Sequence, residues 1–234
     1  MLRASAGLAA AAGLAGCSGG DEETETDDED TATTTPSGTV TLELPDGSTR
    51  CIDPVEGDGA VADYYAFDAD GNRSANVPAE LMENDATVTF VYRNGSSGAL
   101  HLVVVHGDPD SEAAADGAAP MTFEGVDGYE WQVQDGPPGQ VPYSTPNGSF
   151  DGPETALWSW PSDRTDGGAL GPLGEGFEVE ATHLASGSVG DTTLERSGVD
   201  RWLFVDGSAT GQPIEVATVG DGQDVSIGLS AGCQ

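Results

Sequence analysis

The sequence predicts an all-β fold, a single β-sandwich or barrel-like sandwich with short helical turns. Short segments in which apolar and polar residues alternate recur from residue 39 onward, and 34 glycines and 14 prolines punctuate the chain. Alternation with a period of two is typical of half-buried strands, and closely spaced turn residues are typical of antiparallel sheets. We expect helical turns only at residues 78–84 and 110–116.

Two hairpins open the predicted domain. Residues 39–52 alternate around a turn at 45–48, and residues 86–106 alternate around an Asn-Gly turn at 94–95. The polar, Gly-rich segment 162–176 is predicted to be a loop that connects strands or carries binding. Further strands are predicted at residues 128–136, 156–160, 176–184, 200–207, 213–219 and 224–229.

Residues 1–16 have the pattern of a signal peptide. Their apolar run is shorter than the roughly 20 residues that a membrane-spanning helix needs, and it ends in small residues. The segment Leu14-Ala15-Gly16-Cys17 resembles a lipobox, which implies cleavage before Cys17 and lipid on that cysteine. Stable anchoring implies more than one acyl chain. The alternative is a plain secretory signal followed by a coincidental cysteine.

Residues 17–38 are predicted to be a lipidated cysteine followed by a disordered tether. The segment holds eight acidic residues and no large apolar one. It therefore buries too little surface to offset the entropy of ordering, and its like charges extend it. The remaining residues, 39–234, form the predicted sandwich domain.

The charge of the chain indicates its solvent. It has 41 acidic and seven basic residues, a formal net charge of -34, and every basic residue is an arginine. The composition resembles that of proteins of extreme halophiles, especially haloarchaea. In molar salt the Debye length is about 3 Å, so self-repulsion is screened. The same composition argues against a nucleic acid partner, because phosphate contacts need basic patches.

The cysteines predict a disulfide. Without the lipidated Cys17, an exported chain retains one pair, Cys51 and Cys233. Their bond closes a loop of roughly 180 residues, for which chain entropy gives an upper stabilisation of about 5 kcal/mol. The ends of residues 39–234 must then meet, which favours a single domain.

Four aromatic residues are candidates for ligand binding. Trp158 and Trp160 lie two apart on one strand face, and Tyr129 and Trp131 share a face with Val133 on another strand. Exposed aromatic pairs form platforms for sugar rings. A tryptophan pair at strand spacing more often packs in the core, which is the favoured interpretation for Trp158 and Trp160.

The histidines do not predict a metal centre. His101 and His106 lie five apart on one predicted strand and so face opposite sides, while His183 lies on another strand. A blue-copper site also needs a cysteine thiolate close before a histidine, and Cys233 is followed only by Gln234. We expect His106 to be a core residue, and we assign no cofactor.

Asp68, Asp70 and Asn72 begin a weak calcium-loop pattern. Arg73 stands where the loop needs glycine, and Ala79 stands where it needs a glutamate ligand. Turn chemistry is the favoured interpretation of these residues.

Three asparagines, Asn72, Asn94 and Asn147, begin glycosylation sequons in predicted turns. A G-x-S-x-G match at residues 228–232 lies too close to the chain end for a nucleophile elbow with its later partners, and we interpret it as chance.

The leading functional hypothesis is a lipoprotein anchored on the outer face of a halophile membrane. Its β-domain binds a partner protein, a glycan or a small solute, and no residue is assigned a catalytic role. A carboxylate-based envelope hydrolase and a structural surface component are the alternatives. Sequence does not distinguish a catalytic acid pair from the abundant surface acids.

The charge argument makes a direct prediction about folding. In dilute buffer the domain should lose its β-type circular dichroism spectrum, and molar KCl or NaCl should restore it, because salt screens the repulsion. Complete folding without salt would contradict the halophile hypothesis.

Overall fold

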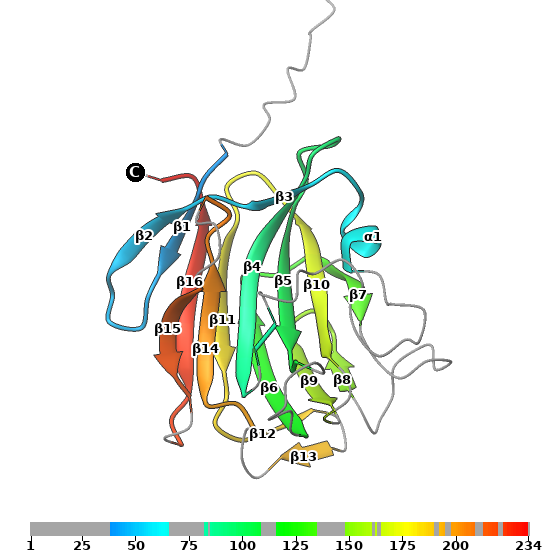
Figure 1. Cartoon of the computed structure of the whole chain (residues 1–234), viewed down its shortest axis with the longest axis vertical. Helices are drawn as coiled ribbons and strands as arrows, with labels where there is room; N and C mark the ends of the chain where they lie inside the picture. Colours follow the sequence, from blue (N-terminus) through cyan, green and yellow to red (C-terminus); the bar gives the residue numbers. More distant parts are fainter. Residues whose placement is uncertain are drawn as a thin grey trace, which may run out of the picture. The chain divides into compact units, whose positions relative to one another are not determined.

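The structure is a computed structural model, and its described part is a β-sandwich (Figure 1). The chain divides into two compact units, residues 1–34 and 35–234, and every described residue belongs to the second. The described residues are 38–65, 82–83, 85–108, 116–134, 148–160, 162, 165–189, 192–194, 198–208, 213–219 and 222–233.

Sheet A contains seven strands, and all of its pairings are antiparallel. The first strand of the domain, β1, pairs with the last, β16. In spatial order the strands are β2 (Thr49–Ile52), β1 (Val40–Glu43), β16 (Val225–Ala231), β11 (Glu178–His183), β6 (Gly117–Glu124), β9 (Thr155–Trp160) and β8 (Gly148–Asp151).

Sheet B also contains seven strands. Both β14 and the short β3 (Val55–Gly57) run parallel to β4, and the other pairings are antiparallel. Its main spatial order is β15 (Ile214–Thr218), β14 (Arg201–Val205), β4 (Ala86–Asn94), β5 (Leu100–His106), β10 (Asp166–Leu173) and β7 (Glu130–Gln134).

Two small elements complete the described structure. Strands β12 (Gly187–Val189) and β13 (Thr192–Leu194) form a separate pair. The helix α1 spans Val61–Tyr65, and in the described ranges no helix is long and apolar enough to cross a membrane. Of the expected helical turns at 78–84 and 110–116, residues 82, 83 and 116 are described and are not helical.

The main core lies between the two sheets. Alternate residues of each strand point inward, such as Val40 and Leu42 from β1 and Leu102 and Val104 from β5. This cluster also includes the large side chain of Trp202 from β14. Inward alternation is the pattern that the sequence predicted, and it holds the two layers together by apolar burial.

Sheet B is buried on its second face as well. Val88, Phe90 and Val103 point away from sheet A and pack in a separate cluster with Val61 and Tyr65 of α1. Burial on both faces explains the nearly continuous apolar run Leu102–Val105 of β5. In β4 the alternating Thr87 and Thr89 are fully buried as well.

The predicted loop at 162–176 is wrong, because residues 166–173 form β10 in the interior of sheet B. Its glycines permit close packing that the sequence does not reveal. A Cβ at Gly168 would lie 3.0 Å from the ring of Trp131, and one at Gly167 would overlap Tyr65 and a backbone carbonyl of β5. Glycine in a strand often marks such a close approach.

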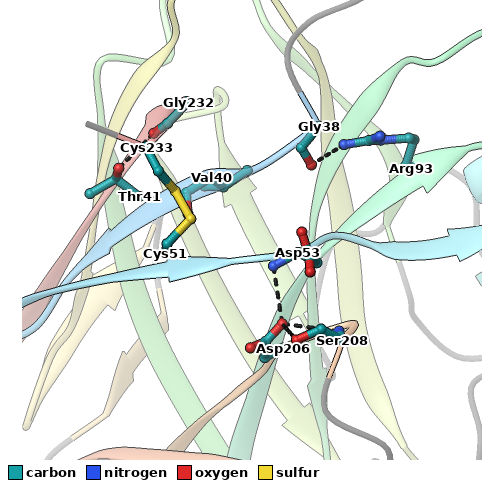
Figure 2. The surroundings of a disulfide bond; sticks show 10 residues. All are labelled: Gly38, Val40, Thr41, Cys51, Asp53, Arg93, Asp206, Ser208, Gly232 and Cys233. Atoms are coloured by element: carbon teal, nitrogen blue, oxygen red, sulfur yellow. Dashed lines mark hydrogen bonds between the residues drawn. A yellow bond between two sulfur atoms is a disulfide. The ribbon is translucent and has the colours of Figure 1, made fainter.

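The predicted disulfide joins the two ends of the domain across β1 (Figure 2). The Cα atoms of Cys51 and Cys233 are 5.6 Å apart, although the two residues are separated by 182 positions. The Sγ of Cys233 lies 3.5 Å from the carbonyl oxygen of Val40, and Thr41 Oγ1 donates to the carbonyl of Gly232 over 2.6 Å. We call this region the entry end of the sandwich.

Polar contacts at the entry end connect the two sheets. Arg93 of β4 donates through Nη2 to the carbonyl oxygen of Gly38, which precedes β1 (Figure 2). The same guanidinium forms an ion pair with Glu56 of β3 at 3.4 Å. Asp206, after β14, accepts a hydrogen bond from the backbone N–H of Asp53, after β2. The chain therefore enters the domain at a point held by both layers.

The carboxylate of Asp206 accepts three hydrogen bonds, one from the β2–β3 turn and two from Ser208. Its Oδ1 accepts from the backbone N–H of Asp53 at 3.0 Å, and from the N–H and hydroxyl of Ser208 at 3.0 Å and 2.8 Å. Burial acts to raise the pKa of Asp206, but these donors outweigh burial and lower it. The carboxylate thus stays charged and keeps β14 connected to the β2–β3 turn.

Candidate binding face

The outward face of sheet A carries four glutamates around a shallow hollow of about 430 Å³. Glu43 comes from β1, Glu124 from β6, and Glu178 and Glu180 from β11. All four are exposed. We call these four residues the glutamate face.

Strand register places three of these carboxylates in one row. Glu124 lies directly opposite Glu180, and Glu180 lies opposite Gly228 of β16. Gly228 in turn lies opposite Glu43. A Cβ at Gly228 would be 3.3 Å from the Cβ of Glu43, so the missing side chain leaves room at the floor of the hollow.

A row of hydroxyls lies beside the row of carboxylates. Register aligns Thr155, Thr122, Thr182 and Ser226 across β9, β6, β11 and β16. The hydroxyls of Thr182 and Ser226 are 2.7 Å apart and hydrogen-bonded. Neighbouring strands lie about 4.8 Å apart, so the hydroxyls form a regular polar array.

A second hollow of about 370 Å³ shares Thr41 and Ser230 with the first. It is lined by the disulfide cysteines and by Arg50 of β2, an exposed guanidinium with five N–H donors. The face therefore offers carboxylate acceptors at one side and a cationic donor at the other.

Like charges meet on the glutamate face. Directly opposite residues of paired strands are near neighbours, and equal charges there are destabilising. Glu124 and Glu180 form such a pair. Screening by molar salt reduces the repulsion, as does a ligand that donates hydrogen bonds or carries positive charge.

The tryptophan pair of the sequence analysis is in the core. Trp158 is fully buried and Trp160 is 4 % exposed. The indole of Trp158 donates to the carbonyl of Gly167 over 2.8 Å, and the ring of Trp160 stacks on His106 with centroids 4.9 Å apart. The favoured core interpretation holds, and neither ring lies on the surface as a sugar platform.

Tyr129 and Trp131 are half-buried and pack against the main core. The prediction that Val133 shares their face is wrong, because Val133 packs with the cluster on the other face of sheet B. Trp131 pairs with Leu170 and Val133 pairs with Ala169, so the register shifts between these two positions of β10. This irregularity turns Val133 to the face of sheet B opposite to Trp131.

All three histidines are buried, and His101 and His106 face opposite sides of sheet B as predicted. His101 contacts Tyr92 on the α1 side, whereas His106 packs on Trp158 between the sheets. His106 Nδ1 is 3.1 Å from Thr87 Oγ1, and His183 Nδ1 is 3.2 Å from the carbonyl oxygen of Leu184. Within the described part of the chain, Nε2 of His106 and of His183 has no hydrogen-bond partner.

Burial controls the protonation of these rings. It lowers the pKa of His183 to about 4 and is the main reason that the pKa of His106 falls well below its usual value. The neighbouring His183 lowers the pKa of His106 further. Both rings are therefore neutral core groups at neutral pH.

Several predicted residues lie outside the described residues. These are the lipidation site Cys17, the calcium-pattern residues Asp68, Asp70 and Asn72, and the sequon residue Asn147. Among the described ranges, no three histidine, cysteine, aspartate or glutamate side chains converge to hold a metal ion.

The G-x-S-x-G match is part of a regular strand. Ser230 lies within β16, opposite Thr41 on one side and Glu178 on the other. A nucleophile elbow needs a sharp turn between a strand and a helix. The chance interpretation of this motif is therefore confirmed.

The glutamate face was not predicted from the sequence. Its signal was present in the alternation of Glu178, Glu180 and Thr182 with buried residues along β11. The partners Glu43 and Glu124 belong to strands far away in the chain, and only the sheet order brings them to the same row.

No known protein family, curated protein or solved structure matches this chain.

The depressed pKa values of His106 and His183 predict a loss of stability in mild acid. In the unfolded chain these rings gain a proton near pH 6.5, whereas in the folded chain they stay neutral down to about pH 4. Their contribution to the free energy of unfolding is therefore complete above pH 6.5 and falls as the pH approaches 4. By pH 5 each ring should cost on the order of 2 kcal/mol. This range lies above the ordinary carboxyl pKa values of about 4.

Urea unfolding in molar KCl at pH 7 and pH 5 measures this loss. His183→Gln should remove the share of the pH-dependent change that His183 contributes, on the order of 2 kcal/mol at pH 5, whatever its effect on absolute stability. An equal pH dependence in the wild type and the variant would contradict the assignment.

Proposed function

We propose that this chain is an extracellular lipoprotein of a halophile, anchored to the outer face of the membrane through Cys17, and that its sandwich binds a cell-surface glycan. The lipobox resemblance and the acidic composition support the location. The glutamate face supports the binding role. A partner protein and a small solute are the other ligand classes for the same face.

The observation that carries the proposal is the acceptor-rich row of Glu43, Glu180 and Glu124 beside a row of hydroxyls. Sugar hydroxyls donate well to carboxylates, and hydrogen bonds to charged groups contribute about 1.5–3 kcal/mol each. A row of acceptors at strand spacing suits a ligand with repeated hydroxyls. Arg50 supplies a donor for an acidic group of the same glycan.

The route of the chain supports a display role. The tether joins the domain at Gly38, whose carbonyl oxygen accepts a hydrogen bond from Arg93. The disulfide between Cys51 of β2 and Cys233 lies beside this point. The glutamate face extends from this region over β1, β16, β11 and β6. A charged, extended tether places such a face away from the membrane surface.

Co-sedimentation with purified cell envelopes of the producing halophile, in molar KCl, tests the proposal. Cys17→Ser lacks the lipid, so it should be released into the medium and serve as the soluble probe. It should bind envelopes after protease treatment and lose binding after periodate oxidation of the glycans.

Glu124→Gln combined with Glu180→Gln should weaken this binding about 10-fold or more, since two charged acceptors are lost. Glu215→Gln on β15 of sheet B is the matched control and should bind normally. Equal binding by the face variant and the control would contradict the role of the glutamate face. Loss of binding with protease instead of periodate would identify a protein partner.

A further inference from the structure

We infer that Asn94, at the turn of the β4–β5 hairpin, is a site of N-linked glycosylation at the entry end of the sandwich. The residue begins the sequon Asn94-Gly95-Ser96, which meets the requirement for asparagine, any residue but proline, and serine or threonine. The inference goes beyond the proposed function and depends only on its export step.

Hydrogen bonds fix the orientation of the Asn94 amide. Its Oδ1 is 2.9 Å from the backbone N–H of Ser96 and 3.2 Å from that of Ser97. Backbone N–H groups only donate, so the atom that receives them must be the carbonyl oxygen and not the nitrogen. In the described part of the chain Nδ2 has no hydrogen bond, and it is the atom that a glycan would modify.

The sequon hydroxyl lies beside the amide. Ser96 Oγ donates to Asn94 Oδ1 over 2.7 Å, so both groups that define the sequon lie together on one turn. Gly95 and Ser96 are exposed, as is Ser97, while Asn94 is half-buried. No refolding of a core strand is needed to reach them.

The turn is held firmly by the backbone behind it. The N–H of Asn94 donates to the carbonyl of Ala99, and the N–H of Gly98 donates to the carbonyl of Asn94. Gly95 N–H donates to Gly57 at the end of β3. A glycan attached here would project from a rigid hairpin.

A glycan at this position would lie close to the point where the tether enters the domain. Arg93, the residue before the sequon, donates to Gly38, where the tether enters the domain. A bulky, hydrated group at Asn94 lies next to this junction. It would shield the junction from proteases, which cleave exposed polar segments most readily.

The chemistry is a group transfer from a lipid-linked oligosaccharide. A bond forms between Asn94 Nδ2 and C1 of the first sugar, and the bond between C1 and the phosphate oxygen of the polyprenyl carrier breaks. The polyprenyl phosphate or pyrophosphate leaves with the electron pair, and Nδ2 loses one proton to solvent. No atom is oxidised or reduced.

Peptide mass spectrometry of the full-length protein, purified from membranes of its halophilic host, tests the inference. The peptide that contains Asn94 should carry a glycan mass. Asn94→Asp keeps an oxygen acceptor for the same turn hydrogen bonds but lacks the nitrogen, so it should fold and lose the added mass.

Substitutions at the two serines separate sequon recognition from turn structure. Ser96→Ala should lose the mass and Ser96→Thr should retain it, while Ser97→Ala next to the sequon should retain it. An unmodified Asn94 peptide in protein recovered from the outer membrane face would overturn the inference, provided that another surface protein of the same cells is glycosylated. Retention of the whole protein in the cytoplasm would instead overturn the proposed export, and this inference with it.

Discussion

The pairing of the first strand with the last is the constraint on which the other features of this domain depend. Strand β1 pairs with β16 inside sheet A, and the disulfide between Cys51 and Cys233 crosses β1 from one side to the other. The described residues lie in one compact unit, residues 35–234, and this closure joins its first and last strands. It also assembles the glutamate face, because Glu43 joins the row of Glu180 and Glu124 only when β1 lies beside β16.

The closure matters more in a chain whose surface repels itself. With 41 acidic and seven basic residues, ion pairs offset little of the repulsion. Apolar burial must supply the stability, and the structure provides it on both sides of sheet B. Among the described residues, Arg93 pairs with Glu56 and donates to Gly38 at the entry end. Arg201 pairs with Glu83 at 2.7 Å at the start of β14.

Local alternation made the fold class and the β4–β5 hairpin predictable from sequence, and the cysteine count made the disulfide between Cys51 and Cys233 predictable. Strand β10 was missed because its glycines look like a loop until Trp131 and Tyr65 are packed on them. Strand β6 was missed because its small residues and Pro120 obscure the alternation of apolar and polar residues. Proline is also rare in central strands such as this one. The candidate face was not predictable, since its rows depend on the register of four strands from distant parts of the chain.

The most direct test of the closure is the free energy of unfolding of Cys51→Ser combined with Cys233→Ser, measured by urea in molar KCl and compared with the wild type. A native link that closes so long a loop should contribute roughly 2–5 kcal/mol, so the variant should unfold at clearly lower urea. Equal unfolding free energies for the variant and the wild type would show that the tie between the chain ends does not stabilise the sandwich.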